Sequence, residues 1–457
     1  MAYQTVDPYT NKLVKTYPAA TDADLEDALA QGHRVYTDWR RQAPAARGPI
    51  LHKVAQLLRE KKHDYAAIMT RDMGKLIGEA EAEVELCATI ADYFADHGEA
   101  FMAPQPLTSS HGKAYYIRQA TGVLVAVEPW NFPFYQVMRV FAPNFMVGNP
   151  MILKHASNTP GSAAAFEDMV REAGAPEGAF KNLFLSYDQV SQAIADPRVS
   201  GVALTGSERG GASVAQEAGK QLKKSSMELG GTDVFIALED ADWDAVYQAA
   251  PNARLRNVGQ VCTSSKRFII PASHYDEFVA QLAAAFKTYQ PGDPMDPATT
   301  LAPMNSERAK EKVQSQIDEA IAHGAHVAYG NQPIDLPGAF IQPTILTDID
   351  KQNPLFSQEI FGPVAEVFKV TNDDEAIALA NDSRYGLGSV VYSQDPAHAD
   401  AIARRIETGM TTINAPFITS PELPFGGVKN SGYGREMDEI GFATFTNEHM
   451  ILNTSVK

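Results

Sequence analysis

Apolar residues recur at helical spacing through the first hundred residues of the chain. In residues 21–39, the apolar positions that share one helical face are Leu25, Ala28, Leu29, Val35, Tyr36 and Trp39. Thr21 precedes this face, and acidic residues follow it in the first turn. A period of 3.6 residues after a capping threonine predicts an amphipathic helix. Similar runs predict helices over residues 46–62 and 78–98.

From residue 122 the pattern changes to short apolar runs that alternate with helical segments. The runs that predict strands are residues 123–128, 151–155, 181–185, 201–205, 224–229 and 233–237. The alternation resumes with a strand at 267–270 and a helix at 276–286. Such alternation predicts an α/β fold in which helices cover both faces of mostly parallel sheets. Two α/β domains in series fit best, with a boundary near residues 231–260.

The last apolar stretch, residues 442–452, is short and lies beyond the motifs described below. It fits an edge strand that pairs with another subunit, and it fits equally a segment that packs on its own domain. The pattern alone leaves both interpretations open.

Composition and charge narrow the class of protein. The chain has 457 residues, enough for two or three domains, and a net charge of −17. This charge disfavours nucleic acid and anionic membranes as partners, and no apolar run reaches the ~20 residues of a membrane helix. The N-terminus resembles no export signal, and the two cysteines favour a reduced, cytoplasmic protein. The 11 histidines are scattered without a metal-binding motif, so no metal site is predicted.

Cys262 is the first candidate catalytic residue. A lone cysteine is usually a small buried hydrophobic residue, as Cys87 is expected to be in its helical stretch. Cys262 instead follows Gly259-Gln260 and precedes Thr263-Ser264-Ser265, a setting unlike that of a core residue. Because a thiolate is the strongest nucleophile among side chains near neutral pH, we interpret Cys262 as a nucleophile.

Glu228 and Asn131 supply two further groups needed for chemistry at a carbonyl carbon. Glu228 ends a predicted strand before Gly230-Gly231, where it is either a solvated carboxylate or a base that activates water against a thioester. Asn131, in Pro129-Trp130-Asn131-Phe132-Pro133, is either a turn residue or a donor to an oxyanion, with the Cys262 N–H as second donor.

Thr205-Gly206-Ser207 follows a predicted strand and begins a helix. Unpaired N–H groups at a helix N-terminus bind anions, so this turn is a candidate phosphate site. It lacks the usual G-x-G-x-x-G pattern, and a capped surface helix explains it equally well.

Together these elements resemble the aldehyde dehydrogenase superfamily in order and spacing over nearly the whole chain. The matching segments are Pro129-Trp130-Asn131-Phe132-Pro133, Lys154, Thr205-Gly206-Ser207, Glu228-Leu229-Gly230-Gly231, Gly259-Gln260-Val261-Cys262, Glu359-Ile360-Phe361-Gly362-Pro363-Val364 and Pro424-Phe425-Gly426-Gly427. The resemblance implies a modified Rossmann cofactor domain (residues 1–102 and 122–230) and an α/β catalytic domain (231–441). It also implies a small β oligomerisation flap (103–121 and 442–457) and a homodimer or homotetramer, which favours pairing for the last segment.

The resemblance also implies a mechanism and a cofactor site. Cys262 would attack an aldehyde, Asn131 would hold the oxyanion, and Glu228 would activate the water that hydrolyses the thioester. Lys154 would hold the adenosine ribose, Ser207 the pyrophosphate and Glu359 the nicotinamide ribose. The other residues expected to contact NAD or NADP are Trp130, Ser157, Thr205, Gly206, Leu229 and Phe361.

Three further positions match the succinate-semialdehyde dehydrogenase branch of that family, where two arginines and a serine grip the substrate carboxylate. They are Arg139, Arg256 and Ser420. A guanidinium fits a carboxylate through two hydrogen bonds, although either arginine could instead form a structural ion pair. The expected activity is therefore oxidation of succinate semialdehyde to succinate. Glutarate semialdehyde, or a broad range of small aldehydes, is the alternative substrate.

Departures from the family pattern refine this expectation. Ser157 stands where NAD-preferring relatives commonly have a glutamate, so a 2′-phosphate meets no like charge and NADP is accepted, with a lean toward preference. His155 replaces the usual proline beside it. Ser264 stands where some relatives have a second cysteine, so no disulfide switch is expected. A coenzyme-A-acylating enzyme and a protein without turnover are the competing interpretations, and the presence of Glu228, Cys262 and Asn131 disfavours them.

Overall fold

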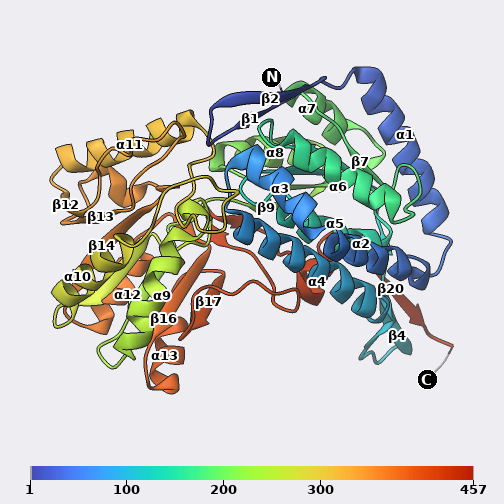
Figure 1. Cartoon of the computed structure of the whole chain (residues 1–457). Helices are drawn as coiled ribbons and strands as arrows, with labels where there is room; N and C mark the ends of the chain where they lie inside the picture. The colour runs from blue at the N-terminus through green and yellow to red at the C-terminus, as the bar shows by residue number, and fades with distance from the viewer. Residues whose placement is uncertain (1–2, 456–457) are drawn as a thin grey trace.

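In the computed structural model, which describes residues 3–455, two large sheets lie side by side in two lobes (Figure 1). A smaller sheet containing β4 and β20 projects from the first lobe. Residues 1–2 and 456–457, at the ends of the predicted cofactor and flap segments, lie outside the described residues. None of the helices within 3–455 combines the length and apolar character that crossing a bilayer requires.

The first sheet has six strands, of which five are parallel and one is antiparallel. In spatial order they are β19 (Gly432–Tyr433), β9 (Lys224–Glu228), β8 (Val199–Thr205), β5 (Val123–Glu128), β6 (Met151–His155) and β7 (Phe180–Asn182). Helices of this lobe are α1 (Asp22–Trp39), α2 (Gly48–Glu60), α3 (Lys62–Met73), α4 (Ile77–Met102), α5 (Tyr135–Val147), α6 (Pro160–Glu172), α7 (Tyr187–Ala195) and α8 (Glu208–Lys220). Short 3-10 helix η1 (Pro44–Ala46) precedes α2.

Both faces of this sheet are buried because side chains alternate along each strand. Along β5, Val123 and Val125 pack with the apolar face of α1, whereas Leu124 and Ala126 belong to the core around α4 and α5. Thr21 caps α1 through the N–H of Asp24, as the sequence predicts. The strand predicted at 181–185 is shorter, because after β7 the chain leaves the sheet toward α7.

The second sheet has seven strands, and only its edge strand β12 is antiparallel to its neighbour. Its order is β12 (His326–Tyr329), β13 (Thr344–Thr347), β14 (Val364–Val370), β11 (Arg267–Pro271), β10 (Val234–Ala237), β16 (Gly388–Tyr392) and β17 (Met410–Ile413). Its helices are α9 (Trp243–Leu255), η2 (Arg256–Gly259), α10 (Tyr275–Phe286), α11 (Glu307–Ala322), η3 (Pro354–Ser357), α12 (Asp373–Asn381) and α13 (Pro396–Ala403).

The third sheet is antiparallel, in the order β20 (Thr446–Asn453), β4 (Lys113–Ala120) and β3 (Gln105–Leu107). Of the last predicted segment, Phe442 in α14 (Asp438–Ala443) and Phe445 are buried in the core of the first lobe. The rest forms β20, which pairs with β4 of the same chain and leaves its other edge free within residues 3–455. Two-stranded ribbons complete the fold: β1 (Tyr3–Asp7) with β2 (Lys12–Tyr17), and β15 (Tyr385–Gly386) with β18 (Val428–Lys429).

The predicted domain boundaries stay a prediction. The order of the strands shows where the chain passes from one sheet to the other. Strands β9 and β10 are five residues apart and belong to different sheets, so the chain changes sheet within residues 229–233. Strand β19, from the segment assigned to the catalytic domain, joins the first sheet beside β9. The chain therefore crosses between the lobes next to Glu228, and residues from both sheets meet there.

Candidate active site

Cys262 follows a tight turn between α9 and β11. Asn257, Val258 and Gly259 have φ of 49°, 56° and 72°, a left-handed conformation that is strained for a β-branched valine. A Cβ on Gly259 would lie 2.3 Å from the carbonyl oxygen of Gly362. The turn thus presses the cysteine loop against residues 359–364, which explains why glycine is needed.

Asn131 lies against the same loop. Its Nδ2 donates to the carbonyl oxygen of Gln260 at 3.1 Å, and Asn257 Nδ2 donates to the carbonyl oxygen of Asn131 at 3.0 Å. Buried His155 supports the segment from behind, because its Nε2 lies 2.9 Å from the carbonyl oxygen of Pro133. Burial lowers the pKa of His155 to about 4, so the ring is neutral and accepts the Ala156 N–H. The histidine that replaces the usual proline is therefore structural.

Cys262 and Asn131 both line a cavity of about 250 Å³ between the lobes. Its other lining residues are Pro129, Trp130, Gln136, Thr205, Gly206, Ser207, Leu229, Gly230, Lys312, Glu359 and Phe361. Seven of the predicted cofactor residues therefore surround the predicted nucleophile. The rings of Trp130 and Phe361 meet edge to face at 5.8 Å, and Glu359 accepts the Gly231 N–H at 3.1 Å.

The turn after β8 supports both interpretations made from the sequence. Ser207 caps α8 by accepting the N–H of Gly210 at 3.3 Å. The same residues, Thr205 to Ser207, line the cavity, so the helix N-terminus with its positive end faces the space where an anion would bind.

Lys154 lies in β6 and Ser157 follows that strand, and neither lines the cavity that contains Cys262. Lys154 is 6% exposed and forms no ion pair with any carboxylate in residues 3–455. Its Nζ lies 5.5 Å from the ring of Tyr187 and 5.9 Å from that of Tyr3. Burial lowers the pKa of Lys154 to about 8. A buried ammonium without a carboxylate partner is suited to a phosphate.

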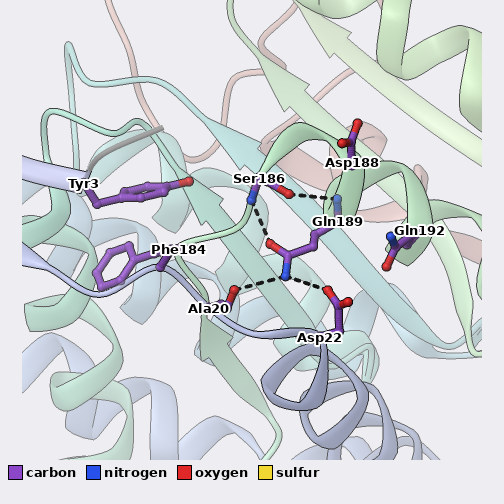
Figure 2. A pocket seen from close by; sticks show the side chains of 9 residues that line it. Tyr3, Ala20, Asp22, Phe184, Ser186, Asp188, Gln189 and Gln192 are labelled. Atoms are coloured by element: carbon purple, nitrogen blue, oxygen red, sulfur yellow. Dashed lines mark hydrogen bonds between the residues drawn. The ribbon is translucent and has the colours of Figure 1, made fainter.

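Tyr187 is a residue that the sequence did not single out, and it is 68% exposed beside Lys154. Its position is fixed by a capping box, in which Ser186 and Gln189 bond to each other's backbone N–H. The amide of Gln189 also donates to the carbonyl oxygen of Ala20 and to Asp22. Figure 2 shows these bonds at the wall of a surface hollow of about 400 Å³ that Tyr3 also lines. The start of α7 is therefore anchored to the N-terminal segment, and Tyr187 is held beside Lys154.

Glu228, at the end of β9, is 1% exposed, and neither carboxylate oxygen has a hydrogen-bond partner within residues 3–455. Burial and the neighbouring Glu436 raise its pKa well above the usual range, and Arg139 and Arg435 oppose this shift. The adjacent residue Leu229 lines the cavity. A buried carboxyl with an upward-shifted pKa has the character of a general base or acid.

Arg139, which is predicted to bind the substrate carboxylate, is paired with a carboxylate of the protein itself. It is 0% exposed in α5, forms an ion pair with Glu436, and donates to Thr205 Oγ1 at 3.1 Å. Its guanidinium also lies 4.1 Å from the ring centre of Phe425. This is the structural ion pair considered above as the alternative, because the guanidinium is already committed to a carboxylate. Contact between Arg139 and a substrate stays a prediction.

Two carboxylates near Arg139 were missed by sequence reasoning. Glu128 ends β5 and is 2% exposed, and Glu436 is 5% exposed. Burial raises the pKa of both, and Arg139 lowers it. Three buried glutamates, including Glu228, therefore share one guanidinium. Nothing in the local sequence pattern indicates such a grouping, since Arg139 and Glu436 are 297 positions apart.

Arg256 occupies the other side of the cysteine loop. It lines a small cavity of about 50 Å³ with Val261 and Thr263, the neighbours of Cys262, and with Phe417. Its guanidinium lies 5.3 Å from the ring centre of Phe132. It lowers the pKa of half-buried Glu79, but no ion pair forms between them in the described structure. This guanidinium is thus available to a ligand.

Ser420 lies on the loop of residues 414–423 that also carries Phe417. It is half-buried, and its hydroxyl bonds to Glu422 and lowers the pKa of that carboxyl. Contact between Ser420 and a substrate stays a prediction.

Comparison with known proteins places this geometry in a family. The family model described as the aldehyde dehydrogenase family matches residues 1–451. A succinate-semialdehyde dehydrogenase (NADP+) from Deinococcus radiodurans is 44% identical over 98% of this chain and 94% of the relative. A probable enzyme of the same name from Synechocystis is 41% identical, with 98% of each chain covered. A crystal structure of succinic semialdehyde dehydrogenase from Streptococcus pyogenes, in complex with NADP+, superposes with a TM-score of 0.98 at 56% identity, covering 99% of this chain and 100% of the other. The chain belongs to the aldehyde dehydrogenase family.

Proposed function

We propose that this enzyme oxidises succinate semialdehyde to succinate with NADP as hydride acceptor. The observation that carries the substrate assignment is Arg256, a half-buried guanidinium without an ion pair in residues 3–455, in a cavity with the neighbours of Cys262. A short aldehyde with a distal carboxylate could pair with it while its carbonyl reached the thiol. The names of the relatives support the same substrate.

The residues present fit NADP. The cavity beside Cys262 has a helix N-terminus for the pyrophosphate and Glu359 for a ribose. Lys154 is a buried cation without a carboxylate partner in the described residues, which suits an additional phosphate, and Ser157 adds no negative charge. When bound, NADP would supply the oxidising power by accepting a hydride at the nicotinamide ring. Lys154, Ser157 and Tyr187 would contact its adenosine end.

The protein's own residues account for the remaining chemistry. The Cys262 thiolate attacks the aldehyde carbon, and Asn131 Nδ2 with the Cys262 N–H donates to the oxygen that becomes negative. After oxidation the acyl group is held as a thioester on Sγ. Glu228 then takes a proton from water, which attacks the thioester and releases the acid and the thiol. Arg139 and Arg435 favour the ionised form of Glu228 that this step needs.

We also propose that the chain assembles as a homodimer or homotetramer. The small sheet that projects from the first lobe exposes Leu107, Met450 and Leu452, which are 41, 56 and 39% exposed. Strand β20 has a free edge in the described structure, and an exposed edge with apolar residues favours pairing between chains. A reduced Cys262 is essential to the proposed reaction, which supports the cytoplasmic location expected from the sequence.

Substitution Arg256→Ala should raise KM for succinate semialdehyde by about 10- to 100-fold, because a charge-assisted hydrogen bond contributes roughly 1.5–3 kcal/mol. KM for butanal, which has no carboxylate, should change less than about threefold. Arg404→Ala removes an exposed arginine on the second lobe and serves as the control. Equal losses on both aldehydes would return Arg256 to a structural role and favour a broad aldehyde specificity. Comparing glutarate semialdehyde in the same assay tests the alternative chain length.

Substitution Ser157→Glu should reverse the preference for NADP. A carboxylate beside Lys154 repels the 2′-phosphate and can bond to ribose hydroxyls, so the ratio of kcat/KM for NADP to that for NAD should fall by tenfold or more. Ser157→Gln has the same size without the charge and should keep most of the NADP preference. If both variants lose the preference equally, size rather than charge determines it.

Substitution Glu228→Gln should preserve the first half of the reaction and block the second. We expect one equivalent of reduced cofactor per active site in a rapid burst, followed by turnover reduced by 10²–10⁴-fold, because the base for water is lost. Stopped-flow absorbance measures the burst, and Glu60→Gln, at the exposed end of α2, is the control. Unimpaired turnover would contradict the role of Glu228. Turnover in the natural enzyme that requires coenzyme A would support acyl transfer instead.

Sedimentation velocity on the full chain should give a mass of two or four chains of 49.6 kDa. The double substitution Met450→Lys with Leu452→Lys should shift the enzyme toward monomers, since it places charge in the predicted interface. Leu222→Lys, at a residue that is 95% exposed, is the matched control. A single 49.6 kDa species for the natural chain would overturn the proposed assembly.

A further inference from the structure

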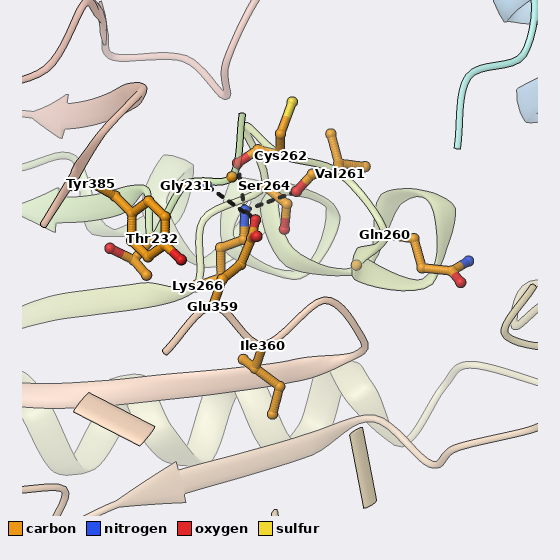
Figure 3. Close-up of polar contacts among 12 residues, drawn as sticks. Gly231, Thr232, Gln260, Val261, Cys262, Ser264, Lys266, Glu359, Ile360 and Tyr385 are labelled. Atoms are coloured by element: carbon orange, nitrogen blue, oxygen red, sulfur yellow. Dashed lines mark hydrogen bonds and ion pairs between the residues drawn. The ribbon is translucent and has the colours of Figure 1, made fainter. Parts of the chain in front are cut away.

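Lys266 is a fully buried lysine beneath the nucleophile loop, four residues after Cys262 and directly before β11. Its Nζ donates to the carbonyl oxygen of Val261 at 2.8 Å and to that of Cys262. It also lies 3.4 Å from Glu359 Oε1. Figure 3 shows the Lys266 and Glu359 side chains next to each other beneath the loop that carries Val261 and Cys262.

An ammonium at this position needs a physical reason. Burying an ammonium costs several kcal/mol unless it is paired, and an apolar residue would fill the same space without that cost. Two main-chain carbonyls accept hydrogen bonds from Lys266, and the Glu359 carboxylate pairs with its charge. Replacing Lys266 would leave the two carbonyl oxygens without this hydrogen-bond donor and Glu359 without this positive charge. The arrangement is therefore built around the charge.

The charge acts on both halves of the active site. Burial raises the pKa of the Cys262 thiol to about 12, and Lys266 is the foremost group that opposes this rise. Arg139 acts in the same direction from α5, whereas Asp233 and Glu359 act against it. Figure 3 places the sulfur on the far side of the main chain from the ammonium, so Lys266 acts through its field rather than by a bond to sulfur.

Glu359 is held on the cofactor side by the same ammonium. Its Oε1 accepts the Gly231 N–H at 3.1 Å and faces Lys266, and its side chain lines the cavity that contains Cys262. Asp233 is a second acidic neighbour. Burial raises its pKa to about 8 even though Lys266 acts to lower it. Glu366, on β14, also lies near these cations. Its pKa is lowered mainly by Arg267 and Arg254, and to a smaller extent by Lys266.

We propose that Lys266 is a positioning residue that fixes the Cys262 main chain and Glu359 at once, and supplies the positive charge that favours the Cys262 thiolate. The proposal rests on the proposed role of Cys262 as nucleophile, but not on the identity of the aldehyde. Lys266 touches neither the reacting carbon nor the sulfur. It links the residue expected to hold the cofactor ribose to the ionisation of the nucleophile.

The test is the pH dependence of Cys262 alkylation by iodoacetamide, in enzyme without cofactor or aldehyde, with the label located by mass spectrometry. Lys266→Met should raise the midpoint of the alkylation profile by about one pH unit or more, so that alkylation below the midpoint slows at least tenfold. Glu359→Gln keeps an acceptor for the Gly231 N–H and removes a negative charge near Lys266, so it should lower the midpoint. Lys310→Met, at a half-buried lysine in α11, should leave the midpoint unchanged.

Opposite shifts in the two variants cannot arise from a general loosening of the loop, which would change access to the thiol in one direction. If Lys266→Met does not fold, Glu359→Gln still tests the proposal. An unchanged midpoint in Lys266→Met, or an upward shift in Glu359→Gln, would overturn it. Because alkylation requires no substrate, failure of this test is distinct from failure of the substrate assignment, which the aldehyde kinetics decide.

Discussion

The active site depends on the burial of Arg254, which joins the nucleophile loop to the loop of residues 359–364. Arg254 comes from α9 and is 0% exposed. Its guanidinium donates to the carbonyl oxygens of Ile360, Gly362 and Val364, and to Ser264 Oγ beside the cysteine. A guanidinium has five donors in a fixed plane, so it can hold two loops in one relative position where a lysine could not. The left-handed turn at residues 257–259 is tolerated because this scaffold surrounds it.

The interior of this acidic chain therefore contains several cations whose partners are mostly main-chain carbonyls. Arg254 and Lys266 stabilise the loops that carry Cys262 and Glu359. A carbonyl oxygen satisfies the hydrogen-bonding need of a cation but leaves its net charge uncompensated. That remaining positive charge is useful beside the half-buried Cys262 thiol, which must ionise to react. The overall charge of −17 belongs to the chain as a whole and says little about this local field.

Local patterns in the sequence predicted much of the fold. The strands at 123–128 and 151–155 agree with the structure residue for residue, because a short apolar run between turns has few alternatives in an α/β protein. The pattern missed α3, which has a weakly segregated apolar face, and β19, which is two residues long. The motifs around Cys262, Asn131 and Thr205 lead to one cavity because each follows the end of a strand or helix that points at the junction between the lobes.

What the sequence did not predict are pairings between distant residues. Arg139 matches a substrate-binding position of the family. In the structure it forms an ion pair with Glu436, which lies 297 positions away in the sequence. Glu128, Tyr187 and Lys266 carry no local signal, since their meaning comes from what lies across a sheet or a loop. A motif predicts where a residue lies along the chain and in its strand or helix. Its bonding partner depends on which charged and polar groups are buried beside it in the folded structure.

The two proposed chemical steps need ionised groups in places that disfavour ionisation, and several cations favour the ionised forms. Cys262 must lose a proton for the attack, and Lys266 is the foremost charge that favours this. Glu228 must be ionised for the hydrolysis, and Arg139 and Arg435 favour that. Arg139 favours the Cys262 thiolate as well, so its charge acts on both groups. Glu436 holds Arg139 in place, and main-chain carbonyls hold Lys266 in place. Both positive charges therefore keep their positions while Cys262 and Glu228 gain or lose protons. The ion pair with Glu436 also leaves Arg256 as the predicted substrate-binding arginine whose guanidinium has no carboxylate partner within residues 3–455.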